Sequence, residues 1–292
     1  MLNLKKTDKM KNFDFRRCAF VLKYDLLGNG RKYLRGLGGL FLACFIVELL
    51  NFYTPSRTGV GVGEEGLWAE LRLLHSVSNI MWLMLAFFVL VAAGLLFDPL
   101  KTKGGRISFL ALPATRMEKY VARWVVAVLL WPAAFLVAFV AADLLRMALC
   151  PLLGHSFPSA VPVFFSSMLD SAVAIFKDTA PRRAASFRDL AENWFPLLAC
   201  LSLHAVYLLG SSFFRKQAFL LTSLTGILLL TVLGFVLAAV EPHHLPAVRY
   251  DSALAVLCLA DFFLLCFIAC CYWLSYRLFS RVQVIQHKWF NV

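Results

Sequence analysis

The chain has 292 residues, of which 61% are hydrophobic and 16% are charged, and its net charge is +12. Soluble globular domains contain about 45–50% apolar and about 25% charged residues, so this composition excludes a soluble globular protein and also a disordered chain. Because the Lys and Arg residues flank apolar runs, we assign them to membrane lipid and topology, and we expect no nucleic-acid partner. The sequence therefore predicts an all-α, polytopic membrane protein.

Residues 1–32 form a basic region that we expect in the cytosol. The hydrophobic pattern predicts an amphipathic helix over 13–27, and the Gly-Asn-Gly sequence at 28–30 is a helix stop signal. Such a helix rests on the inner leaflet with one apolar stripe and docks on protein with the other, or it serves only as a surface anchor. The two stripes are Phe15, Cys18, Leu22 and Leu26, and Phe13, Phe20, Tyr24 and Leu27.

The remainder of the chain, 33–292, is predicted to be a six-helix transmembrane domain. A crossing needs about 20 mostly apolar residues. With the N-terminus inside, 21 of the 29 Lys and Arg residues fall on the cytosolic side, as the positive-inside rule requires. We therefore predict a multi-pass protein of the plasma (inner) membrane with both termini in the cytosol. Its predicted spans are 33–53, 80–97, 121–142, 194–213, 218–240 and 253–274.

The inner loop between the second and third spans has a distinctive sequence. A flexible pair, Gly104-Gly105, precedes a short apolar helix predicted over 107–112, and Pro113 ends that helix because proline lacks an N–H. Thr115 and Glu118 have the spacing of a capping box, which predicts that a new helix begins there and continues into the third span.

This arrangement predicts an apolar knob at the cytosolic surface, formed by Phe109, Leu110 and Leu112. An exposed apolar knob needs a protein partner or the bilayer to cover it. The loop is therefore the first candidate for a functional surface.

The stretch Ser108-Phe-Leu-Ala-Leu-Pro-Ala-Thr-Arg-Met-Glu-Lys-Tyr120 resembles the cytosolic loop of permease subunits of type-2 ATP-binding-cassette (ABC) exporters. Those loops often read Leu-Pro-small-Ser/Thr-Arg-x-Glu just before the third of six spans. The N-terminal helix resembles the elbow helix of the same family. The resemblance implies that the loop over 104–120 is a coupling helix that docks on a separate ABC ATPase subunit.

The same resemblance implies a second permease subunit, identical or related, with which the chain would enclose a transport path. It assigns ATPase coupling to the matching positions, with Leu110 as an additional apolar member. These positions are Phe109, Leu110, Leu112, Pro113, Thr115, Arg116, Glu118 and Lys119.

The chain departs from the family pattern on the outer side. The family usually has two short re-entrant helices between the fifth and sixth spans, whereas here that connection, 241–252, is short and the long outer segment is 146–192. Within it, Ala160–Phe176 is apolar but is interrupted by Pro162 and Asp170. We expect this piece to lie flat on the outer surface or to dip partway into the membrane.

Three carboxylates lie in or beside the predicted spans. Asp261 lies near the middle of the sixth span, where a charge costs about 2.5–3.5 kcal/mol on insertion scales. We expect it to face the bundle interior or a partner subunit, either lining the transport path or making an interhelical hydrogen bond. Glu48 and Asp143 lie nearer the outer ends of the first and third spans, where we expect outside solvent to reach them.

No sequence motif for catalysis is present. The chain has no Gly-x-x-x-x-Gly-Lys-Ser/Thr phosphate loop and no His-Glu-x-x-His zinc helix, and its eight cysteines have no metal-binding spacing. We therefore predict a protein that is not an enzyme and has no metal or cofactor, and whose ATP hydrolysis would come from the partner subunit. The alternative is a non-transporting membrane scaffold or assembly factor. An ion-coupled carrier acting alone would be expected to have more carboxylates at mid-membrane.

Overall fold

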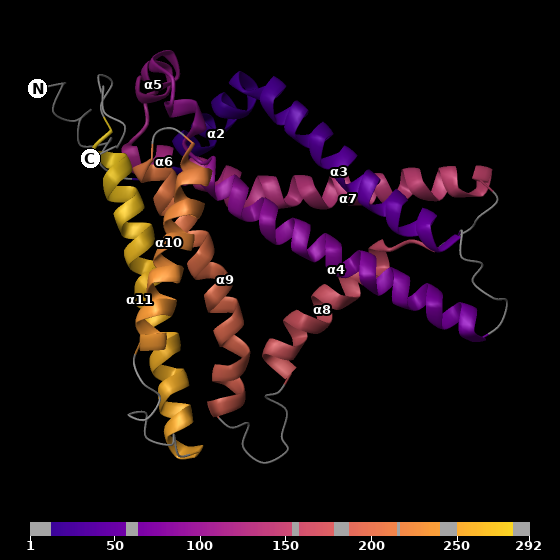
Figure 1. Cartoon of the computed structure of the whole chain (residues 1–292). Coiled ribbons are helices and arrows are strands. Elements are labelled where there is room, and N and C mark those ends of the chain that lie inside the picture. The colour runs from indigo at the N-terminus through magenta and orange to yellow at the C-terminus, as the bar shows by residue number, and fades with distance from the viewer. Residues whose placement is uncertain are drawn as a thin grey trace, which may run out of the picture. The chain divides into compact units, whose positions relative to one another are not determined.

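The computed structural model describes residues 13–56, 64–153, 158–177, 187–214, 217–239 and 250–282. Those residues form helices and short connections, with no β-strand among them, so the predicted all-α class is confirmed for this part of the chain (Figure 1). Residues 1–12, Arg215 and Lys216 of the predicted tight turn, 241–249 of the outer connection and 283–292 lie outside the described residues.

The chain divides into two compact units. Unit 1 comprises 1–22, 90–127 and 174–292, and unit 2 comprises 23–89 and 128–173. The helix α2 (Phe15–Gly28) contributes its first turns to unit 1. Val21 of this helix shares a hydrophobic core with later segments of unit 1.

Unit 2 is built from α3 (Gly30–Ser56), most of α4 (Glu64–Gly94), α7 (Trp131–Leu149) and α8 (Val161–Lys177). Helix α3 packs along α7. The core of the unit is aromatic and aliphatic, and its fully buried members include Cys44, Val77, Met81, Phe135, Phe139 and Phe164.

Helix α8 corresponds to the apolar piece expected on the outer surface. Its first turn packs into the core of unit 2, because Ala160 and Phe164 are both fully buried. The ring of Phe164 stacks on Trp82 at 5.1 Å and meets Phe139 edge-on at the same distance. The N-terminal part of α8 is therefore a structural element of unit 2.

Unit 1 contains α9 (Phe187–Phe213), α10 (Ala218–Ala239) and α11 (Tyr250–Ser280). Helix α9 contacts both α10 and α11, and Figure 1 shows the three running side by side. At the end where α9 stops and α10 begins lie η1 (Asp98–Leu100), α5 (Lys103–Leu110) and α6 (Arg116–Val125). Their shared core includes Val21, Leu96, Phe97, Phe109, Tyr120, Leu208 and Phe279.

Between α6 and α7 the helix widens into a π-helical turn, η2 (Val126–Leu130). The turn lies directly before Trp131 and Pro132. Proline donates no backbone hydrogen bond and its ring collides with the carbonyl one turn earlier, and a π-helical turn accommodates that defect without breaking the helix. The helical segment predicted over 121–142 is therefore longer than expected, because it continues from Arg116 to Leu149.

Within the described residues, five helical stretches are long and apolar enough to cross a membrane: Gly30–Phe52, Leu71–Gly94, Arg116–Leu152, Trp194–Phe213 and Cys258–Ser280. The fifth predicted span, 218–240, corresponds to α10, which is helical over Ala218–Ala239, but its described apolar stretch, Ala218–Val232, is shorter. The second predicted span begins at residue 80, whereas helix α4 begins at Glu64 and its described apolar part is Leu71–Gly94. The polar residues His75, Ser76, Ser78 and Asn79 lie in this earlier part of the helix.

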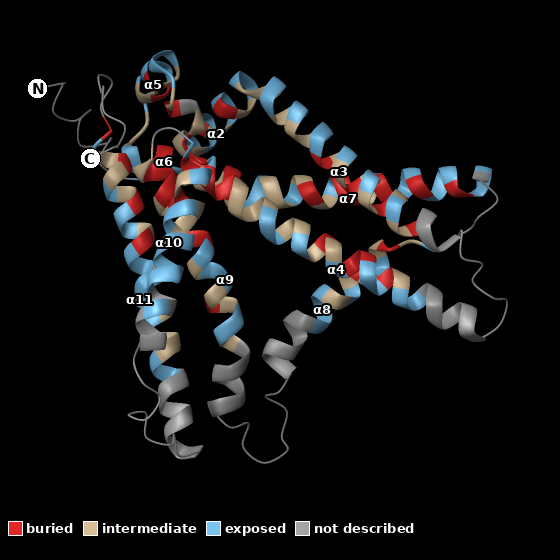
Figure 2. Cartoon of the chain, viewed as in Figure 1, coloured by how far each residue is buried: buried red, intermediate tan, exposed pale blue. Residues whose placement is uncertain are grey.

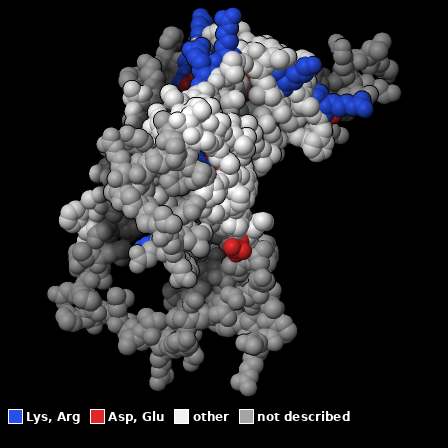
Figure 3. Space-filling model, turned by 90° about the vertical axis from the view of Figure 1, so that its right-hand side faces the viewer, with Lys and Arg blue, Asp and Glu red and all other residues white. Residues whose placement is uncertain are grey.

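Large apolar side chains lie on the outer surface of these helices. On α10 the exposed residues include Leu220, Leu224 and a run from Ile227 to Leu230, and Figure 2 shows exposed residues along α10 and α11. On the face drawn in Figure 3, most of the described surface carries no charged side chain. A surface of this kind is suited to contact with lipid, because hydrocarbon chains cover apolar side chains and a charged side chain is costly there.

The close crossing of α9 and α10 depends on a glycine. A Cβ atom at Gly210 would overlap the side chain of Thr222. We predict that Gly210→Val destabilises the protein by about 1–3 kcal/mol through overpacking. The matched control is Gly226→Val on α10, where a Cβ would meet nothing within 4 Å. Thermal unfolding in detergent measures both variants, and equal melting temperatures for the two would contradict this packing.

Candidate functional site

The predicted coupling loop begins with a capped helix. The side chain of Thr102 accepts a hydrogen bond from the backbone N–H of Gly105 at 3.1 Å and forms the N-cap of α5. The expectation that Gly104 and Gly105 are a flexible lead-in is therefore wrong, because both lie in the first turn of the helix. The helix ends at Leu110, before Pro113, where the sequence predicted a stop.

The predicted capping box at the start of α6 is confirmed. The Oγ1 atom of Thr115 accepts from the backbone N–H of Glu118 at 3.2 Å, and the Oε2 atom of Glu118 accepts from the N–H of Thr115 at 2.7 Å. These two bonds satisfy N–H groups that a helix start leaves without intrahelical partners.

Glu118 also links the loop to the N-terminal helix. Its Oε1 atom accepts from the backbone N–H of Asp14 at 2.8 Å and forms an ion pair with Nη2 of Arg17 at 2.9 Å. The thiol of Cys18 lies 3.6 Å from the carbonyl oxygen of Glu118 and donates to it. Glu118 is fully buried, and a buried carboxylate is stable only when donors of this kind replace water.

Two buried cations connect the loop to neighbouring backbone. The Nζ atom of Lys119 donates to the carbonyl oxygen of Leu110 at 2.7 Å, which joins the end of α5 to α6. The guanidinium of Arg123 donates through Nε to the carbonyl oxygen of Leu96 at 2.8 Å and through Nη2 to the same atom, which joins α6 to the end of α4. Both carbonyls lie near helix ends, where they have no intrahelical donor.

The same end of unit 1 contains a chain of hydroxyl groups. The hydroxyl of Tyr120 donates to Oγ of Ser275 at 3.2 Å, and Ser275 lies 2.5 Å from Oγ of Ser212. Tyr120 belongs to α6, Ser212 to α9 and Ser275 to α11. The loop helix is therefore connected by hydrogen bonds to two of the long helices of unit 1.

The exposed surface of the loop differs from the predicted apolar knob. Phe109 is only 3% exposed and lies in the core of unit 1, while Leu110 and Leu112 are half-buried. Phe109 is buried because it packs in the same core as Val21, Leu96 and Phe97. Five of the exposed residues form what we name the loop face, namely Ile107, Ala111, Pro113, Arg116 and Met117.

The eight predicted coupling residues thus divide by location. Pro113 and Arg116 are exposed on the loop face, and Thr115 is half-buried in the capping box. Phe109, Glu118 and Lys119 are buried. They stabilise the loop from inside, and a partner protein would not contact them. Their role in coupling to an ATPase remains a prediction.

Sequence reasoning missed several members of this site. Ile107 and Ala111 are four residues apart, a spacing that places two side chains on one helix face once the start at Thr102 is recognised. No local signal connects Arg17 with Glu118, because the two residues are far apart in the sequence and belong to different helices.

The thiol of Cys18 lies in an environment that disfavours its thiolate. Burial raises the pKa of Cys18, and the negative charge of nearby Glu118 raises it further. The reactive form of a cysteine is the thiolate. Cys18 is therefore a slow nucleophile near neutral pH and a native reporter of the contact between α2 and α6.

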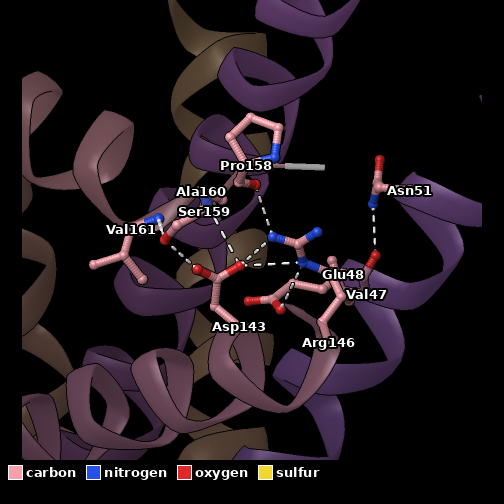
Figure 4. Close-up of polar contacts among 9 residues, drawn as sticks. All are labelled: Val47, Glu48, Asn51, Asp143, Arg146, Pro158, Ser159, Ala160 and Val161. Carbon is pink, nitrogen blue, oxygen red and sulfur yellow. Dashed lines mark hydrogen bonds and ion pairs between the residues drawn. The ribbon is translucent and has the colours of Figure 1, made fainter. Parts of the chain in front are cut away.

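Unit 2 contains a second polar cluster, which Figure 4 shows in close-up. Asp143 of α7 is fully buried and accepts from Nη2 of Arg146 at 2.6 Å and from Nε at 3.1 Å. It also accepts from the hydroxyl of Ser159 and, at 3.4 Å, from the N–H of Ala160. The expectation that solvent reaches Asp143 is wrong, because the segment leading into α8 covers it.

Glu48 of α3 belongs to the same cluster. It is fully buried, so the expectation of outside solvation is also wrong, and its Oε2 atom lies 3.7 Å from Nε of Arg146. The guanidinium of Arg146 stacks 3.9 Å above the ring of Phe52. Arg146 was not singled out in the sequence, although it follows Asp143 at the i,i+3 spacing of a helical ion pair.

Asp261 of α11 lies apart from these clusters. Its side chain is half-buried, one of its carboxylate oxygens is buried, and it makes no hydrogen bond to a described residue. The interhelical hydrogen bond predicted as one alternative is therefore not made within the described part of the chain. Among the described residues, no group of three or more His, Cys, Asp or Glu is placed to hold a metal ion.

No protein-family model, curated protein sequence or solved structure matches the chain. The function is therefore argued from the loop and the two polar clusters themselves.

A variant at Glu118 tests the link between α2 and α6. We predict that Glu118→Gln lowers the pKa of Cys18, since it removes a negative charge beside the thiol. At a fixed pH the thiolate fraction then rises, so alkylation of Cys18 becomes several-fold faster and the rate–pH profile moves to lower pH. The measurement is the alkylation rate in a variant whose other cysteines are replaced.

Thr115→Ala is the matched control, because it removes half of the capping box but leaves the carboxylate beside Cys18. Its alkylation profile should stay near that of the parent protein. Coincident profiles for Glu118→Gln and the parent would contradict the contact.

Proposed function

We propose that this protein is the permease subunit of an ABC exporter in the plasma (inner) membrane, coupled through the 104–120 loop to a separate ATPase subunit. A second permease subunit, identical or related, completes the transport path, and both termini lie in the cytosol. The chain itself hydrolyses no ATP. The observation that supports this proposal best is the loop face, an exposed apolar and basic surface on a loop that buried charges hold in one conformation.

A coupling element must transmit force, and a flexible loop would absorb it. Here the two loop helices are joined by the bond from Lys119 to the carbonyl of Leu110, and α6 is joined to α4 by Arg123. Displacement of the loop face therefore moves α6 and the end of α4 together. Because α6 continues through η2 into the apolar helix α7, a movement of α6 also pulls or pushes on the start of α7.

The position of the loop supports the predicted topology. The ends of α9 and α11 and the start of α10 lie beside η1 and α5, around a small pocket of about 20 Å³ lined by residues that include Phe97, Lys101, Arg106, Ser211 and Phe279. The sequence assigned all of these segments to the cytosolic side. Their gathering at one end of unit 1 is what a cytosolic docking platform for an ATPase requires.

The chemistry of the loop face suits a protein groove. Ile107 and Met117 are each 46% exposed, and Ala111 and Pro113 add small apolar contacts between them. Arg116 supplies one positive charge that would orient the loop against an acidic rim. Buried apolar anchors of this kind account for most of the binding energy in protein interfaces.

The alternative is a non-transporting membrane scaffold, which would use the same surface to assemble with a different partner. The two functions differ in the partner that they predict. An exporter subunit binds a protein with a phosphate loop and alters its ATPase rate, whereas a scaffold has no need of either property.

We predict that Ile107→Asp abolishes recovery of a phosphate-loop ATPase with the affinity-tagged protein from native membranes in mild detergent. The reason is that a charge replaces an apolar anchor at the centre of the loop face. Ile107→Val is the matched control and should retain the partner. The measurement is mass spectrometry of the captured proteins together with the ATPase rate of the complex.

Two outcomes would count against the proposal. The first is capture from the parent protein without any nucleotide-hydrolysing partner. The second is an ATPase rate that does not change between Ile107→Asp and Ile107→Val when both proteins have the melting temperature of the parent.

A further inference from the structure

The buried cluster of unit 2 has one more carboxyl group than it has cations. Glu48, Asp143 and Arg146 all have side chains that are fully buried, or within 1% of it. If all three were ionised, the cluster would hold a net negative charge away from solvent. Several kcal/mol are lost when a charge is buried without compensation, so proteins neutralise such groups or pair them.

The hydrogen bonds show which carboxyl group is the ionised one. Asp143 accepts two N–H groups of Arg146, the hydroxyl of Ser159 and the N–H of Ala160. These donors surround both of its oxygens, as a carboxylate requires. Asp143 and Arg146 therefore form a neutral, hydrogen-bonded ion pair (Figure 4).

Glu48 has no comparable set of donors. Within the described part of the chain, neither of its carboxyl oxygens makes a hydrogen bond, and its only ion pair is with Nε of Arg146 at 3.7 Å, a nitrogen that already donates to Asp143. A hydrogen bond at that distance would not form. The same guanidinium also stacks on Phe52, so its positive charge is shared among three neighbours.

Among the described residues, the groups around Glu48 offer no other compensating charge. Cys44 lies one turn earlier on α3, α7 contributes Asp143 and Arg146, and the segment before α8 contributes Ser159. The buried residues that α4 contributes to unit 2 are uncharged, namely Leu74, Val77, Ser78 and Met81, and His75 lies on the exposed side of that helix.

We propose that Glu48 is a proton-binding site: in the packed state of α3 and α7 its carboxyl group holds a proton taken from water, and it returns that proton to water when the two helices separate. The step is a simple protonation, in which a carboxylate and a proton give a neutral carboxylic acid. Proton binding is thereby linked to the packing of α3 on α7, whatever partner the loop face has.

A metal cation is a weaker occupant for the same position. The guanidinium of Arg146 lies 3.7 Å from Oε2 of Glu48 and would repel a cation bound there. The nearest carboxylate, Asp143, already uses its oxygens to accept hydrogen bonds. A proton is the one cation that a single unsupported carboxylate can bind in this position.

Infrared spectroscopy of the reconstituted full-length protein tests the proposal directly. A protonated carboxyl group has a C=O stretch that is absent from a carboxylate, and deuterium oxide shifts it. We expect such a band at neutral pH in the parent protein and its loss in Glu48→Gln. Asp143→Asn should also lose it, because Glu48 would then be the one carboxylate that pairs with Arg146. Asp261→Asn is the control and should retain the band.

The pH dependence of the free energy of unfolding is a second, independent test of the proposal. If folded Glu48 holds a proton that the unfolded chain releases above about pH 4.3, each pH unit changes the unfolding constant up to tenfold. The sign is a loss of stability as pH rises, and Glu48→Gln should lack this dependence because glutamine does not titrate. The proposal is overturned if the parent has no carboxyl band at neutral pH, if the band survives in Glu48→Gln, or if both proteins show the same pH dependence.

Discussion

The carboxylate of Glu118 is the interaction on which the proposed coupling surface depends. It is buried, and it takes its donors from two distant places in the sequence, the start of α2 and the start of α6. Without those donors the burial of a charge would be unfavourable, so α2 and α6 must remain together for either to keep its position. The loop face is therefore presented by a small assembly of helices and not by a free loop.

Glu118 and Glu48 are both fully buried glutamates, but they differ in the hydrogen bonds that their carboxyl groups accept. Glu118 has hydrogen-bond donors on both oxygens and an arginine at 2.9 Å, which fixes its charge and its neighbours. Glu48 has no hydrogen bond and shares its arginine with Asp143. The first arrangement makes a rigid support, and the second makes a group whose protonation responds to the packing around it.

Much of the helical architecture could be predicted from local signals. The capping box at Thr115 and the stop before Pro113 are short-range features, and both are confirmed. The start of α5 was missed because Gly104 and Gly105 suggest flexibility, while the cap from Thr102 outweighs that tendency. The burial of Phe109 was missed for a different reason, because it depends on packing against distant residues such as Val21 and Phe279.

The polar clusters could not be predicted because they are formed by tertiary packing. Asp143 and Glu48 lie near the ends of apolar segments, a position that indicates solvent, and only the packing of α3 and of the segment before α8 on α7 buries them. Arg17 likewise has a structural role only through its ion pair with Glu118, which is far away in the sequence. Sequence periodicity reports which face of a helix is apolar, but not which charged groups meet when helices pack.

The central claim is that the loop face meets an ATPase, and a photo-activated cross-linker at Ala111 in native membranes tests it most directly. Ala111 is exposed and lies at the C-cap of α5, so a larger side chain fits there without disturbing the core. The proposal predicts a cross-link to a phosphate-loop ATPase that changes when nucleotide is added. Cross-links only to lipid or to the chain itself would contradict it.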